Sequence, residues 1–111
     1  MELHKKKCVP CRGDIPPFTK DQIDEYLKFL ADWKVLINEK KAFYLSRTFK
    51  FKNFYDSLEF INKLSKIAEM EGHHPDLKFG WGYAEVYIYT HAINGLSLSD
   101  FILASKIDQL N

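Results

Sequence analysis

Several features that mark particular classes of protein are scarce or missing in this sequence. Its 111 residues hold only two cysteines and carry a formal net charge of +1. A chain of this length can bury roughly two-thirds of its unfolded surface, so it can fold without disulfide bonds. A net charge so close to zero gives no reason to expect direct binding to nucleic acid. No apolar run reaches the about 18 residues of a membrane-spanning helix, and the N-terminus lacks the apolar core of a signal peptide, so we expect a cytoplasmic protein with no membrane partner.

The first residues of the chain differ in composition from the rest. Residues 1–18 are charged and contain the breakers Pro10, Gly13, Pro16 and Pro17, which predicts an irregular N-terminal arm. The remaining residues, 19–111, have the size of one compact domain and are rich in aromatic side chains. We therefore expect a single domain that follows a short arm.

The two cysteines, Cys8 and Cys11, form a Cys-x-x-Cys pair inside this arm. Such a pair can be half of a zinc site, a redox pair, or two thiols in a loose segment. The zinc interpretation needs two more ligands, and because there is no second Cys-x-x-Cys, histidines would have to supply them. The redox interpretation is weakened because no βαβ pattern follows. The sequence leaves these alternatives open.

Capping patterns and one apolar stripe predict three helices. Thr19 with Gln22 opens the first helix, and Ser97 with Asp100 opens the last. Between them, apolar residues recur at spacings of three and four, as on one face of an amphipathic helix; they are Phe54, Leu58, Ile61, Leu64 and Ala68. The expected helices cover about 20–31, 53–70 and 98–109.

Alternation of side chains predicts four strands, at about 33–37, 43–49, 75–79 and 83–90. In the last strand Ala84, Val86 and Ile88 share one face, and the tyrosines between and beside them share the other. The order of elements is α-β-β-α-β-β-α, with the strands grouped in hairpins. This order predicts an α+β fold in which a four-stranded antiparallel sheet carries three helices on one face.

Three of the four histidines, His73, His74 and His91, fall within 19 residues. Imidazole is the only side chain whose ordinary pKa lies near neutrality, so such a cluster is suited to proton transfer. Pro75 restricts His74 to extended backbone, which helps to fix its direction. If the last strand stays regular to its end, His91 shares a face with its tyrosines. The end of the long helix and the end of the last strand can then meet at one edge of the sheet.

Each member of this group also has an ordinary structural interpretation. Histidines near loop ends are often surface residues, and Asp100 at the third position of a helix caps it and suits the helix dipole. Glu69 lies in the last turn of its helix, where the dipole disfavours an acid, and this mildly favours a role in a site. Trp33 is of a type found more often in a core or an interface than in a ligand platform.

The spacing E-x-x-x-H-H-P-x(15)-H-x(8)-D, from Glu69 to Asp100, resembles the signature of the pterin-4a-carbinolamine dehydratases. The resemblance covers nearly the whole chain; its further pieces are Cys8-x-x-Cys11 before Pro16-Pro17, a helix ending near Trp33, Thr90-His91, Gly95-Leu96-Ser97, and residues 104–108. It implies the same α+β fold. It also implies dehydration of 4a-hydroxytetrahydropterin to quinonoid dihydropterin, within tetrahydropterin recycling and without a metal or coenzyme.

The resemblance further implies roles for individual residues. It makes His73, His74 and His91 the catalytic residues, with the first two as the main proton donors and acceptors. Asp100 is then an orienting carboxylate; Pro75 and Trp33 are parts of the pterin pocket. Because of its place in the last turn of its helix, we also expect Glu69 to bind or orient the substrate. An alternative is a non-enzymatic binding or assembly protein of the same fold, of the kind linked to transcription-factor dimerisation or to Rubisco assembly.

We also expect self-association. A four-stranded sheet leaves two edge strands, and exposed edges favour pairing with another chain. The tyrosine face of the last strand, opposite the helices, would otherwise meet water, and aromatic residues are enriched at interfaces. The family resemblance likewise implies a dimer or a dimer of dimers.

Overall fold

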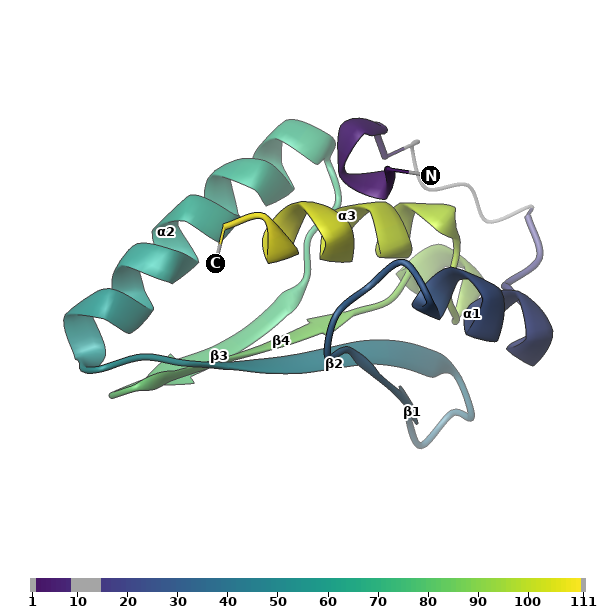
Figure 1. Ribbon diagram of the computed structural model, residues 1–111. Helices are drawn as coiled ribbons and strands as arrows, with labels where there is room; N and C mark the ends of the chain where they lie inside the picture. The colour runs from purple at the N-terminus through teal and green to yellow at the C-terminus, as the bar shows by residue number, and fades with distance from the viewer. Residues whose placement is uncertain (1, 9–14, 111) are drawn as a thin grey trace.

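The computed structural model describes residues 2–8 and 15–110, whose course Figure 1 shows. The elements are the 3₁₀-helix η1 (Leu3–Lys5), α1 (Lys20–Leu27), β1 (Lys34–Ile37), β2 (Phe43–Lys50), α2 (Phe54–Glu71), β3 (Asp76–Gly80), β4 (Tyr83–Ile88), the 3₁₀-helix η2 (His91–Ile93) and α3 (Leu98–Asp108). The predicted order α-β-β-α-β-β-α and the α+β class are confirmed.

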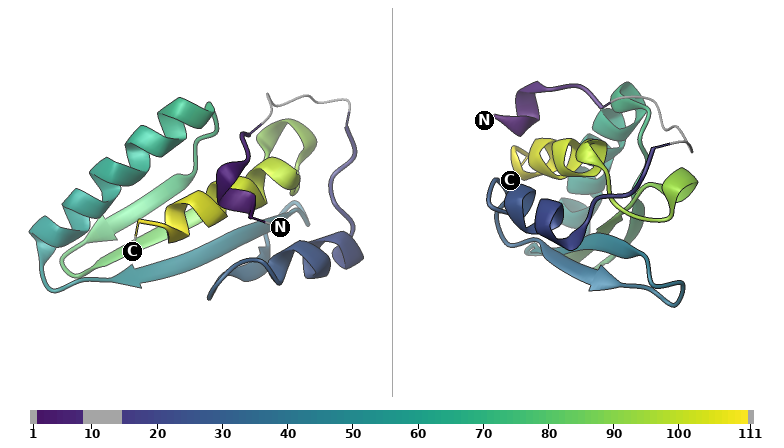
Figure 2. Two further views of the ribbon diagram at one scale, coloured as in Figure 1. Left: turned by 45° about the horizontal axis from the view of Figure 1, so that its top comes forward. Right: turned by 90° about the vertical axis from the view of Figure 1, so that its right-hand side faces the viewer.

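The four strands form one antiparallel sheet in the order β1-β2-β4-β3. The central strands β2 and β4 pair from Leu45 opposite Ile88 to Lys50 opposite Tyr83. Figures 1 and 2 show the helices on one face of this sheet, with α2 and α3 next to each other and α1 toward one end. Within the part of the chain that the structure describes, the opposite face carries no helix.

The alternation in β4 decides which face of the sheet is buried. Ala84, Val86 and Ile88 all point into the core, as the sequence predicts, and they meet apolar residues from the helices. Helix α3 is buried over most of its length, including Phe101 and Leu103. Burial of one such large apolar side chain contributes about 1.5–3 kcal/mol, so α3 is the element around which the domain packs.

The ends of the helices follow from their capping residues. The Thr19–Gln22 capping box is present at the start of α1. At α3 the backbone N–H of Ser97 donates to Asp100 Oδ2 over 2.8 Å. Helix α2 ends at Gly72, whose φ of 64° lies in the left-handed region that glycine adopts most readily. This turn directs the next two residues, His73 and His74, out of the helix.

Two elements stop earlier than the sequence predicts. Helix α1 ends at Leu27 rather than near residue 31, and the following turns bring Trp33 into the core. Strand β4 ends at Ile88 rather than at residue 90, because Thr90 pairs with Gly95 across a short loop. His91 consequently begins the 3₁₀-helix η2 and is not the last residue of a regular strand.

The arm contains one element that the sequence did not predict. The short 3₁₀-helix η1 packs on α3, and Leu3 is buried in the core. Cys11 lies outside the described residues, so the structure leaves the Cys-x-x-Cys alternatives untested. Over residues 2–8 and 15–110, we find no helix with the length and apolar character needed to cross a membrane.

Candidate active site

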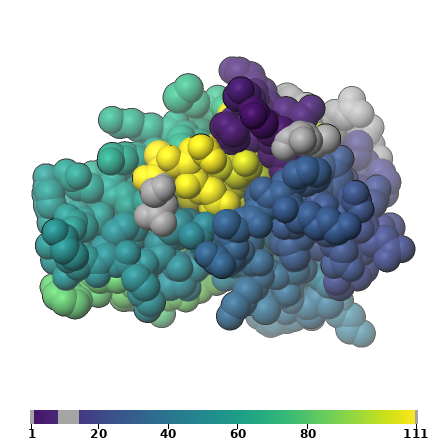
Figure 3. Space-filling view, in the orientation of Figure 1, coloured from purple at the N-terminus to yellow at the C-terminus, as the bar shows by residue number. Residues whose placement is uncertain are grey.

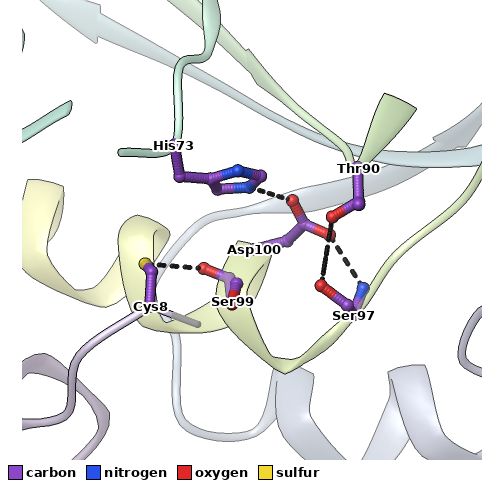
Figure 4. A network of polar contacts seen from close by, with 6 residues as sticks. All are labelled: Cys8, His73, Thr90, Ser97, Ser99 and Asp100. Carbon is purple, nitrogen blue, oxygen red and sulfur yellow. Dashed lines mark hydrogen bonds and ion pairs between the residues drawn. The ribbon is translucent and has the colours of Figure 1, made fainter. Parts of the chain in front are cut away.

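His73 and Asp100 form the buried centre of the candidate site, shown in Figure 4. His73 follows the C-cap of α2, and Asp100 lies in the first turn of α3. His73 Nε2 lies 2.6 Å from Asp100 Oδ1. The side chain of His73 is 12% exposed and that of Asp100 is 0% exposed. A contact this short and this shielded from water fixes the orientation of the imidazole.

The second oxygen of Asp100 is held by residues of the loop that precedes α3. Asp100 Oδ2 accepts a hydrogen bond from Thr90 Oγ1 over 2.8 Å and another from the backbone N–H of Ser97 over 2.8 Å. The Thr90 and Ser97 hydroxyls also lie 3.0 Å apart. With Oδ2 occupied in this way, Oδ1 is left for His73. A buried carboxylate with its hydrogen bonds satisfied is held in one orientation.

This arrangement selects one tautomer of the neutral His73 ring. An ionised carboxylate only accepts hydrogen bonds, so the proton shared with Asp100 Oδ1 belongs on His73 Nε2. In neutral imidazole the other nitrogen then carries a lone pair. His73 Nδ1 is therefore the atom of this ring that can take up a proton.

His74 lies next to this pair but in a different environment. Its Nε2 contacts Glu69 Oε2, in the last turn of α2, and both side chains are largely exposed. Pro75 follows at once and leads into β3. Glu69 is an ion-pair partner for His74 when the imidazole is protonated. The pair can therefore hold a proton at the surface of the site.

His91 directly follows Thr90, the residue whose hydroxyl binds Asp100. Its ring packs against that of Tyr89, with 4.2 Å between the ring centroids, so the expected proximity of His91 to this tyrosine is present although the strand has ended. Both side chains line a hollow of about 300 Å³, together with Asn94 and residues 38–40 of the turn between β1 and β2. This hollow has room for a small planar ligand beside an exposed imidazole.

Trp33 is held at the opposite end of α3 from Asp100. It is buried, and its indole N–H donates to Asp108 Oδ1 over 2.8 Å. Asp108 ends α3, eight residues after Asp100, which corresponds to about 12 Å along a helix. Burial raises the pKa of Asp108, whereas the Trp33 indole and the Arg47 guanidinium act in the opposite direction. Within one chain, Trp33 therefore belongs to a polar cluster at the far end of α3.

Two contacts of the site have no counterpart in the sequence analysis. From the sequence, Thr90 was of interest only as the residue before His91, yet its hydroxyl donates a hydrogen bond to Asp100. Glu71, two residues before His73, is buried beside the arm and accepts the backbone N–H of Cys8. The signal that could have found Glu71 is the one used for Glu69, namely an acid in the last turn of a helix, where the dipole disfavours it.

The thiol of Cys8 also lies near this centre. Burial, and then the neighbouring Glu71 carboxylate, raise the pKa of Cys8 to about 12, so it stays protonated at neutral pH. A thiolate is the form that binds a metal, and this environment opposes its formation. Among the described residues, no three His, Cys, Asp or Glu side chains are grouped so that they could hold a metal ion.

Comparison with known proteins points to one family. The family model for pterin 4 alpha carbinolamine dehydratase matches residues 16–110. Similar curated proteins carry the name "Putative pterin-4-alpha-carbinolamine dehydratase". The one from Rubrobacter xylanophilus is 42% identical, covering 98% of this chain and 98% of its own length. The one from Rickettsia canadensis is 49% identical, covering 96% of this chain and 94% of its own length.

Solved structures show the same fold. A transcriptional coactivator/pterin dehydratase from Brucella melitensis has a TM-score of 0.76 at 26% identity, covering 85% of this chain and 97% of that one. A pterin dehydratase-like protein described as a RuBisCO assembly factor in the alpha-carboxysome has a TM-score of 0.61 at 20% identity, covering 72% of this chain and 89% of that one. At that identity the second likeness concerns the fold alone.

Proposed function

The chain belongs to the pterin 4 alpha carbinolamine dehydratase family, and on that premise we propose that it converts 4a-hydroxytetrahydropterin to quinonoid dihydropterin. In this reaction the bond between ring carbon 4a and its hydroxyl oxygen breaks. The neighbouring ring nitrogen loses its proton, and a carbon–nitrogen double bond forms. The hydroxyl leaves as water once it has received a proton. The reaction would serve the recycling of tetrahydropterin.

The reaction needs one group that takes a proton and one that gives a proton. We assign the first role to His73, because its Nε2–H is held by Asp100 and its Nδ1 lone pair can accept the proton of the ring nitrogen. We assign the second to His74, whose pairing with Glu69 can hold a proton for the departing hydroxyl. Positioned acid–base catalysis of this kind contributes about 10²–10⁴-fold in rate.

The remaining site residues would bind and orient the pterin. His91 lines the hollow beside Tyr89, so its imidazole can contact a flat ring there. Pro75 keeps the backbone of His74 extended. Trp33 would contribute only through a second chain or a rearrangement of its surroundings, because its indole is committed to Asp108. The single observation that carries the proposal is the buried His73–Asp100 pair in a chain of this family.

A dehydration assay on the purified protein tests the proposal. The 4a-carbinolamine should decay faster with protein than in buffer, and a chelator should leave the rate unchanged. A rate equal to that of buffer alone would remove the enzymatic function. Binding of pterin without turnover would instead favour the binding or assembly role, and strong loss of activity with chelator would favour the zinc interpretation of the Cys-x-x-Cys pair.

We further propose that the protein acts as a homo-oligomer, most simply a dimer. The open sheet face, defined by Leu36, Tyr44, Ser46, Glu85 and Tyr87, borders a hollow of about 450 Å³. The Tyr44 and Tyr87 rings lie 6.2 Å apart on it. A hydrogen bond of 2.5 Å to Glu85 raises the pKa of Tyr87 to about 12, so its hydroxyl stays a donor. Such an aromatic surface, bordered by the edge strands β1 and β3, suits contact between two chains.

A further inference from the structure

The N-terminal segment Glu2–Cys8 lies against α3, which carries Asp100, and contacts the last residue of α2, two residues before His73. Figure 3 shows this segment seated on α3. Leu3 anchors it, being only 1% exposed and part of the apolar core. This contact accounts for the docking of the segment but gives no reason for its polar contacts near the candidate site.

Cys8 touches both helices one or two residues from the catalytic pair. Its backbone N–H donates to Glu71 Oε1 over 2.9 Å, and its thiol donates to the carbonyl oxygen of Ser99 over 3.4 Å. Glu71 precedes His73 by two residues, and Ser99 directly precedes Asp100. Figure 4 shows the thiol contact next to the His73–Asp100 hydrogen bond. One residue of the arm thus connects the end of α2 to the beginning of α3.

Lys106 strengthens the same connection from α3. Its ammonium lies 3.7 Å from Glu71 Oε2 and donates to the carbonyl oxygen of His4 over 2.8 Å. The Glu71 side chain is 6% exposed. A carboxylate shielded to this degree needs its partners, because an unpaired buried charge is strongly destabilising. Glu71 therefore has one charged partner on α3 and one backbone partner in the arm.

We propose that Glu71 and Cys8 are positioning residues, which clamp the end of α2 against α3 and so hold His73 in hydrogen-bonding contact with Asp100. The role in catalysis rests on the proposed dehydration, whereas the clamp itself does not. Neither residue is among those that we expect to touch the pterin, so they would act through His73. Misplacement of a catalytic group by about 1 Å can lower a rate by about 10²-fold.

The chemistry of the thiol agrees with this role. Because the raised pKa of Cys8 keeps its proton at neutral pH, the thiol can donate to the Ser99 carbonyl oxygen throughout the physiological range. A serine hydroxyl would keep that donor, and an alanine would not. The clamp also lies partly outside the region that the family model matches, which begins at residue 16.

Substitutions in the full-length protein test the clamp. Glu71→Ala removes the acceptor for Cys8 and the partner of Lys106, and should lower kcat by about tenfold while KM changes by less than about twofold. Glu71→Gln keeps an oxygen for the Cys8 N–H and should recover part of the loss. Cys8→Ala should lower kcat by a smaller factor, and Cys8→Ser should restore it.

Leu64→Ala is the matched control, because Leu64 is a fully buried residue of the same helix α2 that contacts none of the clamp residues through a hydrogen bond. It should lower the melting temperature at least as much as Glu71→Ala and leave kcat within about twofold of the native value. An equal fall of kcat in both variants would show that Glu71 contributes only to stability, and would overturn the proposal.

A second measurement does not depend on enzymatic activity. Proton NMR of ¹⁵N-histidine-labelled protein follows the His73 Nε2 proton, which should exchange with water at least about tenfold faster in Glu71→Ala than in the native protein or in Leu64→Ala. Unchanged exchange in Glu71→Ala would overturn the clamp. If the native protein shows no dehydratase activity but the exchange rates differ as expected, the proposed function fails and the clamp stands.

Discussion

Replacement of Asp100 by asparagine should reverse the tautomer of His73. Asparagine has nearly the shape of aspartate, and its amide oxygen can still accept the Ser97 N–H and the Thr90 hydroxyl at the Oδ2 position. The amide NH₂ would then face His73, where the structure has Oδ1. Two donors cannot share one hydrogen bond, so the imidazole must move its proton from Nε2 to Nδ1. That change removes the lone pair which we assign to proton abstraction.

The expected loss of stability is moderate. The donors of Thr90 and Ser97 keep a neutral acceptor, and hydrogen bonds to charged groups contribute about 1.5–3 kcal/mol against about 0.5–1.5 kcal/mol for neutral ones. An amide is also easier to bury than a carboxylate, which offsets part of the difference. We expect a net loss of about 1–2 kcal/mol, or about 4–12 °C in melting temperature.

The expected loss of activity is larger. The corresponding replacement in a Ser-His-Asp triad lowers kcat by about 10⁴-fold through the wrong tautomer. Because His74 and His91 would remain, we expect a fall of about 10²–10³-fold here. We expect an effect of this size because Asp100 is completely buried and its contact with His73 is shielded from water.

Two measurements on Asp100→Asn decide the matter. Steady-state dehydration kinetics give kcat, and ¹⁵N chemical shifts of the His73 ring report which nitrogen carries the proton. The exposed carboxylate of Asp24 offers a control, since Asp24→Asn should change neither. Native activity together with a proton still on Nε2 in Asp100→Asn would refute the assignment of His73 as base.

Three further predictions concern other parts of the molecule. His74→Ala should lower kcat with a stability change within about 0.5 kcal/mol, and His91→Ala should raise KM. Steady-state kinetics and thermal unfolding measure these effects, and native behaviour of both variants would contradict the site. Because the pKa of Cys8 is raised from 9.0 to about 12, the folded protein keeps a proton that the unfolded chain loses as the pH rises above 9. The stability of the native protein relative to Cys8→Ser should therefore be full below about pH 9 and fall as the pH rises toward about 12. Denaturant unfolding at about pH 8 and about pH 10.5 measures this difference, and equal differences at both pH values would speak against a raised pKa of the half-buried thiol. Light scattering at micromolar concentration should give a multiple of the 13.1 kDa chain mass, whereas the monomer mass would end the proposal of a dimer.

The spacing of apolar residues predicted those helices and strands that pack against the core through one regularly spaced apolar face. The apolar stripe from Phe54 to Ala68 predicted α2, and the alternation around Val86 predicted β4. The face of β4 that was predicted to be buried does point into the core. The capping pattern at Ser97 marked the start of α3 correctly. In each case the signal is local, because the same residues that form the element also pack against the core.

The structure differs from the sequence-based predictions where contacts between distant segments of the chain decide the conformation. Strand β4 stops early because of the Thr90–Gly95 pairing, which no alternation pattern encodes. Leu3 is a single apolar residue in a charged segment, so nothing local predicts that it enters the core. Glu71 looks like a surface acid of an amphipathic helix until the arm covers it.

The candidate site shows the same division. The spacing of the histidines and Asp100 predicted which residues to consider, and the structure joins His73 to Asp100 and His74 to Glu69. No sequence pattern indicated that Thr90 orients the Asp100 carboxylate, because that contact depends on the geometry of the loop before α3. The expected place of Trp33 in the pocket stays a prediction, which a structure with bound pterin would test.

The most direct test of the account compares the native protein with a variant that lacks all three imidazoles, His73→Ala, His74→Ala and His91→Ala combined. The decay of the 4a-carbinolamine is followed by absorbance for both proteins and for buffer alone, after thermal unfolding has shown that the variant is folded. We predict fast decay with the native protein and decay at the buffer rate with the folded variant. Equal, accelerated decay with both proteins would contradict catalysis by the histidines.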